Sequence, residues 1–280
     1  MTRGPLESAV TALFVPGDRP ERFGKACEAG PGLVIIDLED AVASDSRPAA
    51  REAAAAFLSS PAASARVPVL VRINAAGTPD FALDVAALAA LPAGALPGVV
   101  LAKAEDPRVV DTVRAALGDV PIIPIVESAR GLASAEALAA AAGVVRLAFG
   151  ALDFSLDLDC APDDAVLLPA RSRIVLASRL ADRAAPLDSP STAIADEAVV
   201  RDAAARARAL GFGGQLCIHP SQVRVVEAAF APTEAEIEWA RRVVGAEGGA
   251  ARVDGRMVDR PVTERARRLL ERAAENGRRA

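Results

Sequence analysis

The sequence of 280 residues contains little cysteine, lysine, histidine or aromatic side chain, and no tyrosine. Its three cysteines are odd in number and widely spaced, so they predict neither a disulfide framework nor a zinc site and favour a reduced, cytoplasmic protein. The formal net charge of −5 leaves no basic footprint for nucleic acid. No signal peptide is visible, and the uncharged stretch 85–102 is broken by proline and glycine, which argues against a membrane span.

Eight short apolar runs alternate with alanine-rich helical stretches. The predicted strands lie at 11–15, 33–37, 67–74, 98–102, 121–126, 144–149, 184–187 and 214–218, and the run at 184–187 is the weakest. The predicted helices lie between them at 20–29, 47–58, 79–91, 106–117, 132–142, 165–183 and 195–210. Eight such units favour a TIM (β/α)8 barrel over residues 1–230, with a doubly wound open sheet as the alternative.

A C-terminal helical extension is predicted over residues 231–280. Helical stretches at 233–246 and 261–276 flank a glycine-rich break at 245–255. A tail joined through such a break is expected to leave its own barrel and pack on a neighbouring subunit.

Two carboxylates follow neighbouring predicted strands. Glu127 directly follows the run PIIPIV, and Asp153 comes four residues after the next strand, in Gly150-Ala151-Leu152-Asp153. Barrel enzymes place their active sites at the C-terminal ends of the strands. Two carboxylates there can share one Mg²⁺, which keeps its waters and leaves room for substrate. The alternative is that both residues only cap helices.

The third strand ends in Arg72-Ile73-Asn74, where Arg72 follows three apolar residues that we expect to be buried. A buried arginine needs an anionic partner, which could be a substrate carboxylate, a developing oxyanion or the acidic run Asp37, Glu39 and Asp40. That run could surround a metal site or form salt bridges with nearby arginines. Lys103, at the end of the fourth strand, could pair with it or contact substrate.

Two further strand ends carry candidate residues. Arg19, Arg22 and Lys25 follow the first strand, where they could bind phosphate or simply begin a solvated helix. The single histidine, His219, ends the eighth strand. It could act as a general base, but orienting a loop is the more common use of such a residue. PGDRPERF, after the first strand, does not match the dinucleotide fingerprint.

Taken together, these motifs resemble the citrate lyase β-subunit-like branch of the aldolase/citrate lyase (HpcH/HpaI) superfamily. The matching segments run in the family's order over nearly the whole chain. They are LFVPGDRPERF (13–23), IIDLEDAV (35–42), VRINAAGT (71–78), LAKAE (101–105), IVESARGL (125–132), RLAFGALDFSLDL (146–158), ARSRIVLASR (170–179), LCIHPSQV (216–223), AFAP (229–232) with WARRVV (239–244), and DGRMVDRPV (254–262). Family members often carry glycine where Asp159 stands and usually proline where Ala102 stands.

The resemblance implies a TIM barrel, a homotrimer or dimer of trimers, and a C-terminal segment that reaches a neighbouring subunit. It implies Mg²⁺ on Glu127 and Asp153, with Arg72 stabilising the oxyanion of a thioester enolate. Asp259 would complete the adjacent subunit's site and exchange a proton with the enolate carbon. Coenzyme A would run over the loop that holds Arg19, Arg22 and Lys25.

The activity implied is cleavage or formation of a carbon–carbon bond in a hydroxyacyl-CoA thioester such as citryl-, malyl- or citramalyl-CoA. The products of cleavage would be acetyl-CoA and a 2-oxo acid, and no cofactor beyond Mg²⁺ would be needed. A thioesterase and a β subunit that acts on acyl-carrier-protein thioesters are alternatives. An aldolase acting on free 4-hydroxy-2-oxo acids is disfavoured, because those relatives generally use a histidine base near the start of the barrel.

Overall fold

A computed structural model describes residues 4–60, 67–246, 251–254 and 256–277. The chain divides into two compact units, Met1–Glu227 and Ala228–Ala280, which are considered separately below. In these described ranges, no helix is both long and apolar enough to cross a membrane. All three cysteines are free thiols.

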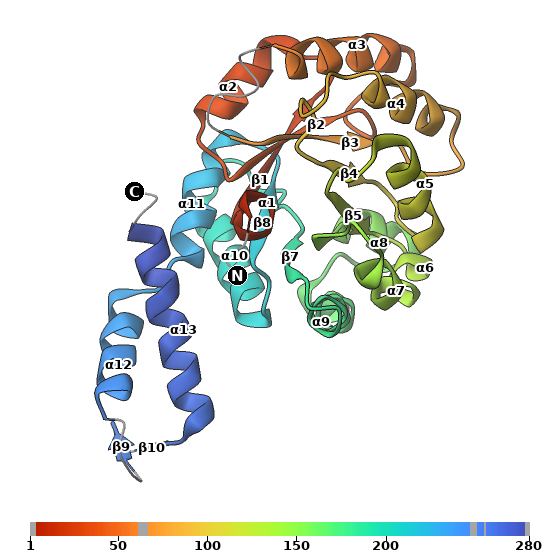
Figure 1. The fold of residues 1–280 in the computed structure, drawn as a ribbon. Helices are drawn as coiled ribbons and strands as arrows, with labels where there is room; N and C mark the ends of the chain where they lie inside the picture. Colours follow the sequence, from red (N-terminus) through yellow and green to blue (C-terminus); the bar gives the residue numbers. More distant parts are fainter. Residues whose placement is uncertain (1–3, 61–66, 247–250, 255, 278–280) are drawn as a thin grey trace. The chain divides into compact units, whose positions relative to one another are not determined.

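The first unit is a closed barrel of eight parallel strands in sequential order, because β1 pairs with both β2 and β8 (Figure 1). The strands are β1 (Thr11–Pro16), β2 (Leu33–Asp37), β3 (Val69–Ile73), β4 (Val99–Leu101), β5 (Ile122–Val126), β6 (Arg146–Phe149), β7 (Ala184–Asp188) and β8 (Gly214–Cys217). The predicted TIM barrel is therefore confirmed, including its weakest strand, and the doubly wound sheet is excluded.

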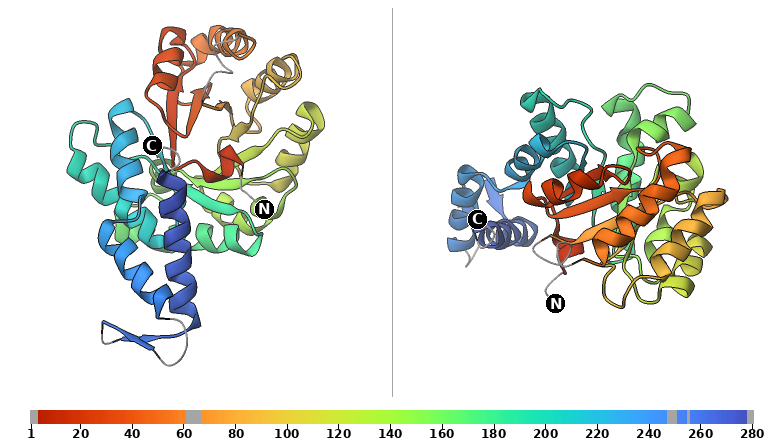
Figure 2. Two further views of the ribbon diagram at one scale, coloured as in Figure 1. Left: turned by 60° about the vertical axis from the view of Figure 1, so that its left-hand side comes forward. Right: turned by 90° about the horizontal axis from the view of Figure 1, so that it is seen from above.

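Helices cover the outside of the barrel (Figure 2). Several begin where the sequence supplies proline in the first turn or an aspartate or serine cap: Asp106, Asp163 and Asp196 each accept a hydrogen bond from a backbone N–H of the helix that follows. The helices of this unit are α1 (Pro5–Ser8), η1 (Pro20–Arg22), α2 (Phe23–Glu28), η2 (Ser44–Ser46), α3 (Arg47–Leu58), α4 (Pro79–Ala89), α5 (Pro107–Leu117), α6 (Ala129–Ala133), α7 (Ala135–Ala140), α8 (Ala151–Asp157), α9 (Asp164–Leu180), α10 (Glu197–Leu210) and α11 (Pro220–Phe230), which runs across the division between the units.

The barrel interior is filled by alternate residues of its strands. One buried cluster joins Leu33, Ile35, Leu70, Val100, Ile123, Ile125, Leu187 and Leu216 with Leu6 and Ala9 from the N-terminal segment. Arg146 of β6 is fully buried and donates to the backbone oxygens of Leu6 (3.2 Å), Ala9 (2.7 Å) and Ala185. This guanidinium therefore ties α1 to the barrel.

Two features of the first unit differ from the prediction, and a third was not predicted. The predicted helix 132–142 is two shorter helices, α6 and α7, which meet at Ser134. The segment after β6, where no helix was predicted, is the helix α8, and Asp153 lies in its first turn. The β6–β7 pairing has an irregular register, and the β7 strand includes Pro186, which cannot donate a ladder hydrogen bond.

The second unit is a helical hairpin with a small antiparallel pair of strands. Its elements are α12 (Glu234–Gly245), β9 (Ala251–Val253), β10 (Arg256–Val258) and α13 (Arg260–Gly277). Ala240, Val243, Ala266 and Leu269 form its buried core. Of the predicted glycine-rich break, residues 247–250 and 255 lie outside the described residues. Packing of this unit on a neighbouring subunit stays a prediction.

We expect Arg146→Met to lower the free energy of unfolding by about 3 kcal/mol or more, because buried backbone oxygens would lose their donor. Urea titration followed by circular dichroism measures the change. Arg183→Met is the matched control: Arg183 also donates to backbone oxygens, of Ala139 and Ala141, but it is only partly buried. Its loss should lower stability by about 1 kcal/mol. Equal losses would contradict the role of Arg146 in holding α1.

Candidate active site

The predicted site residues of the first unit converge because the parallel strands share one carboxyl-end rim. Asp37 is the last residue of β2, and its partner in the β2–β3 register is Arg72. Glu127 directly follows β5, and Asp153 follows β6 in the first turn of α8. Closure of the barrel therefore assembles side chains that lie far apart in the chain.

Arg72 is bound to the acidic run. Its Nε and Nη2 donate to the two carboxylate oxygens of Asp37, each at 2.6 Å, and Nη1 lies 2.9 Å from Oε2 of Glu39. The guanidinium also lies over the ring of Phe14, 4.9 Å from its centroid. Burial lowers the pKa of Arg72, but the hydrogen bonds and charge of Asp37 outweigh it and raise the pKa. The salt-bridge alternative for Arg72 is thus present, and contact with substrate stays a prediction.

Lys103 supplies the second cation of this network. Its Nζ donates to Oε1 of Glu39 and lies 3.2 Å from Oδ1 of Asp40. Burial raises the pKa of Glu39, although Arg72 and Lys103 both lower it. The acidic run, Arg72 and Lys103 therefore form one ion-paired cluster at the rim, in which two cations face three carboxylates. The salt bridges that the sequence offered as the alternative to a metal site are thus present.

Glu127 is a buried carboxylate, 3% exposed. Its Oε1 accepts a hydrogen bond from the backbone N–H of Lys103 at 2.6 Å. Burial raises the pKa of Glu127 to about 8, against the lowering effects of that hydrogen bond and of Arg72. A Cβ atom on Gly150 would lie 2.4 Å from Oε2 of Glu127, so the side chain needs a glycine there. The carboxylate is thus held between Lys103 and Gly150.

Asp153 is half-buried, and its charge contributes to the raised pKa of Glu127, so the two carboxylates are electrostatic neighbours. Within the described residues, no hydrogen bond reaches Asp153, and only the one from Lys103 reaches Glu127. The remaining oxygens are therefore available to a cation. The same residues contain no group of three or more histidine, cysteine or acidic side chains arranged for a metal. Mg²⁺ needs only one or two carboxylates, since water and substrate complete its shell, so this pair fits it.

Arg19, Arg22 and Lys25 form a separate exposed cationic segment after β1. The carboxylates nearest to the two arginines are Asp18, at 3.9 Å from Arg19, and Glu21, at 3.8 Å from Arg22. Exposed pairs at such distances are weak. The three cations are thus accessible to an anionic ligand.

The two remaining candidates occupy capping positions. His219 precedes α11, and its Nδ1 accepts from the backbone N–H of Ser221 at 3.2 Å, which supports the loop-orienting interpretation. In the second unit, Oδ1 of Asp259 accepts from the backbone N–H of Val262 at 3.2 Å, at the start of α13. The contribution of Asp259 to a neighbour's site stays a prediction.

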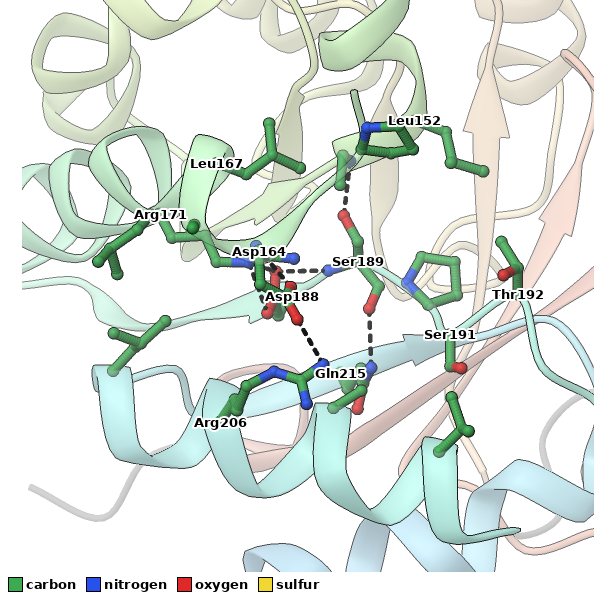
Figure 3. Close-up of a pocket in the computed structure, with 18 of the residues that line it drawn as sticks. Leu152, Asp164, Leu167, Arg171, Asp188, Ser189, Ser191, Thr192, Arg206 and Gln215 are labelled. Carbon is green, nitrogen blue, oxygen red and sulfur yellow. Dashed lines mark hydrogen bonds and ion pairs between the residues drawn. The ribbon is translucent and has the colours of Figure 1, made fainter. Parts of the chain in front are cut away.

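A cavity of about 570 Å³ lies beside α9, α10 and the end of β7 (Figure 3). Its polar wall contains Asp188, whose carboxylate accepts a hydrogen bond from Nε of Arg171 at 3.1 Å. It also contains Ser189, whose hydroxyl donates to the backbone oxygen of Phe149 and accepts from the backbone N–H of Ala151. None of the predicted site residues lines it. Asp188 was not predicted, although it directly follows the predicted strand 184–187, as the candidate residues of the other strands follow theirs.

Comparison with known proteins decides the family. The sequence profile described as HpcH/HpaI aldolase/citrate lyase matches residues 11–220. The chain belongs to this family. A citrate lyase subunit beta-like protein of Mycobacterium tuberculosis is 42% identical over 274 residues, which cover 94% of this chain and 95% of the relative. A (3S)-malyl-CoA thioesterase of Cereibacter sphaeroides is 30% identical over 94% of each chain.

A solved structure extends the likeness to three dimensions. The crystal structure of protein CitE from M. tuberculosis in complex with magnesium, acetoacetate and coenzyme A matches with a TM-score of 0.84 at 38% identity, covering 96% of this chain and 99% of that one. The predicted citrate lyase β-like resemblance is therefore confirmed. In the present chain, Asp159 has φ = 50°, a left-handed conformation that favours glycine. This conformation gives a physical reason for the glycine that other family members often carry at this position.

We expect Gly150→Ala to weaken Mg²⁺ binding by about 10- to 100-fold, because the added methyl group would displace the carboxylate of Glu127. Gly150 has φ = −107°, so the effect would be steric and not a matter of backbone preference. Isothermal titration calorimetry measures the affinity. Gly24→Ala is the control, since a Cβ there meets nothing within 4 Å and the affinity should not change. Unchanged binding by Gly150→Ala would contradict the placement of Glu127.

We expect the metal-free protein to lose stability relative to Glu127→Gln as the pH rises from about 5 to about 8.5. The folded protein holds the Glu127 proton up to a pKa of about 8, whereas the unfolded chain releases it near the ordinary value of 4.5. Stability therefore falls between these two values, by about 1.4 kcal/mol per unit of pKa difference. Urea unfolding in a chelator measures it. If the free energies of unfolding of the wild type and of Glu127→Gln changed in parallel with pH, Glu127 would not be desolvated in the folded protein.

Proposed function

We propose that the protein is a Mg²⁺-dependent carbon–carbon lyase that cleaves or forms a hydroxyacyl-CoA thioester such as citryl-, malyl- or citramalyl-CoA. Acetyl-CoA and a 2-oxo acid would be the products of cleavage and the substrates of synthesis. The observation that carries the proposal is the buried carboxylate of Glu127 beside Asp153, at the carboxyl-end rim of a barrel of this family. The magnesium, acetoacetate and coenzyme A in the M. tuberculosis relative support the same assignment.

Glu127 and Asp153 would hold the Mg²⁺ ion. When bound, it would act as a Lewis acid toward the oxygens of the 2-oxo acid. The fixed position of Glu127, between the N–H of Lys103 and the backbone of Gly150, would keep one ligand oriented before substrate arrives.

Arg72 would stabilise the oxyanion of the thioester enolate. Asp37 engages Nε and one Nη2 hydrogen, and Nη1 pairs with Glu39, so the second hydrogens of Nη1 and Nη2 are the ones that could reach a ligand. In the cleavage direction, the substrate hydroxyl would give its proton to water as its C–O bond becomes the carbonyl of the 2-oxo acid, and the carbon–carbon bonding electrons would pass to the enolate. Asp259 from a neighbouring subunit would then protonate the enolate carbon, and it would remove that proton in synthesis.

The same proposal extends to the ligand, the oligomeric state and the cellular location. Arg19, Arg22 and Lys25 would bind the phosphates of coenzyme A, since guanidinium and ammonium groups suit phosphate and these are exposed. The working form would be a homotrimer or a dimer of trimers, in which the C-terminal unit of one copy reaches another. We expect it to act in the cytoplasm, where its three free thiols stay reduced.

A thioesterase is the second candidate, supported by the C. sphaeroides relative that is named (3S)-malyl-CoA thioesterase. It would release free coenzyme A and leave the hydroxy acid intact. The citrate lyase subunit beta-like name of the M. tuberculosis relative supports a third, a subunit that acts on acyl-carrier-protein thioesters. Activity of the isolated chain on a CoA ester would argue against the carrier-protein hypothesis.

We expect Asp153→Ala to abolish Mg²⁺-dependent release of acetyl-CoA from malyl- or citramalyl-CoA while the protein stays folded, because the site would lose a metal ligand. Mass spectrometry of the products measures the turnover and separates the lyase from the thioesterase. Asp157→Ala is the control on the same helix, since Asp157 instead accepts from the backbone N–H of Ala129 at 2.7 Å. Full turnover by Asp153→Ala would refute the metal assignment.

A further inference from the structure

Lys103 has an unusual backbone conformation. Its φ is 46°, in the left-handed region that side chains with a Cβ rarely adopt. The other described non-glycine residues with positive φ are Asp159, Asp182 and Asp254, and aspartate tolerates this region better than a long aliphatic side chain does. Strain of this kind persists only where surrounding contacts determine it, and it is common at functional sites.

Lys103 contacts both Glu127 and the acidic residues Glu39 and Asp40. Its backbone N–H donates to Oε1 of Glu127 at 2.6 Å. Its side chain reaches Glu39 and, at 3.2 Å, Asp40, which belong to the ion-paired cluster around Arg72. One residue thus connects that cluster with the carboxylate assigned to the metal.

We propose that Lys103 is a positioning residue: the ion pairs of its Nζ with Glu39 and Asp40 hold the left-handed turn that aims its N–H at Glu127. This inference rests on the proposed function, in which Glu127 is a Mg²⁺ ligand. Without the ion pairs, residue 103 relaxes to negative φ, its N–H turns away, and the carboxylate loses the hydrogen bond that orients it. The acidic run then affects the metal through geometry and not only through charge.

Two variants with the same loss of charge separate these effects. Lys103→Met removes the cation and leaves a side chain that disfavours the left-handed region, whereas Lys103→Gly removes the cation but accepts that conformation. In calorimetric titrations with Mg²⁺, we expect Met to weaken binding by about 10- to 100-fold and Gly by no more than about threefold. Equal weakening by both, or weakening by neither, would overturn the inference.

A metal-free measurement keeps this test independent of the proposed function. The chain has only two lysines, Lys25 and Lys103, so ¹⁵N-lysine labelling yields two backbone amide signals. In a chelator, Glu39→Gln should move the Lys103 signal upfield and speed its exchange with solvent, while the Lys25 signal stays in place. An unmoved Lys103 signal would overturn the inference. Failure of the wild type to bind Mg²⁺, with the Lys103 signal displaced as expected, would instead contradict the proposed function.

Discussion

Closure of the parallel sheet is the constraint on which the rest of the structure depends. Since β1 pairs with β2 and β8, no strand edge remains, and every strand directs its carboxyl end to the same rim. Strands as short as β4, with three residues, suffice because alternate side chains fill the interior. Asp37 and Arg72 lie at or next to the carboxyl ends of their strands, where the candidate active site lies.

At this rim, one group of carboxylates is paired with cations and another is not. Asp37, Glu39 and Asp40 face Arg72 and Lys103 across short ion pairs. Within the described residues no salt bridge reaches Glu127, and the nearby charge of Asp153 adds to the unfavourable energy of ionising it. A divalent cation would relieve that imbalance, and this electrostatic argument agrees with the magnesium bound by the M. tuberculosis relative.

Local sequence predicted the elements well where composition and burial agree. All eight strands were predicted, since apolar runs such as Leu33–Asp37 suit a position buried on both faces. The helix α8 was not among the predicted helices, because its 7 residues are too few to show a helical period. Ser134 divides the predicted helix 132–142, and only the completed barrel explains why the proline-containing β7 is a strand.

By itself, the sequence determined the fold class, the family and the residue types at each strand end, because these follow from periodicity and from motifs in order along the chain. The tertiary structure alone decided which of those residues meet. The binding of Arg72 by Asp37, the burial of Glu127 against Gly150 and the left-handed turn of Lys103 depend on distances between separate strands. Such distances are set by barrel closure and register, and no local pattern of residues records them.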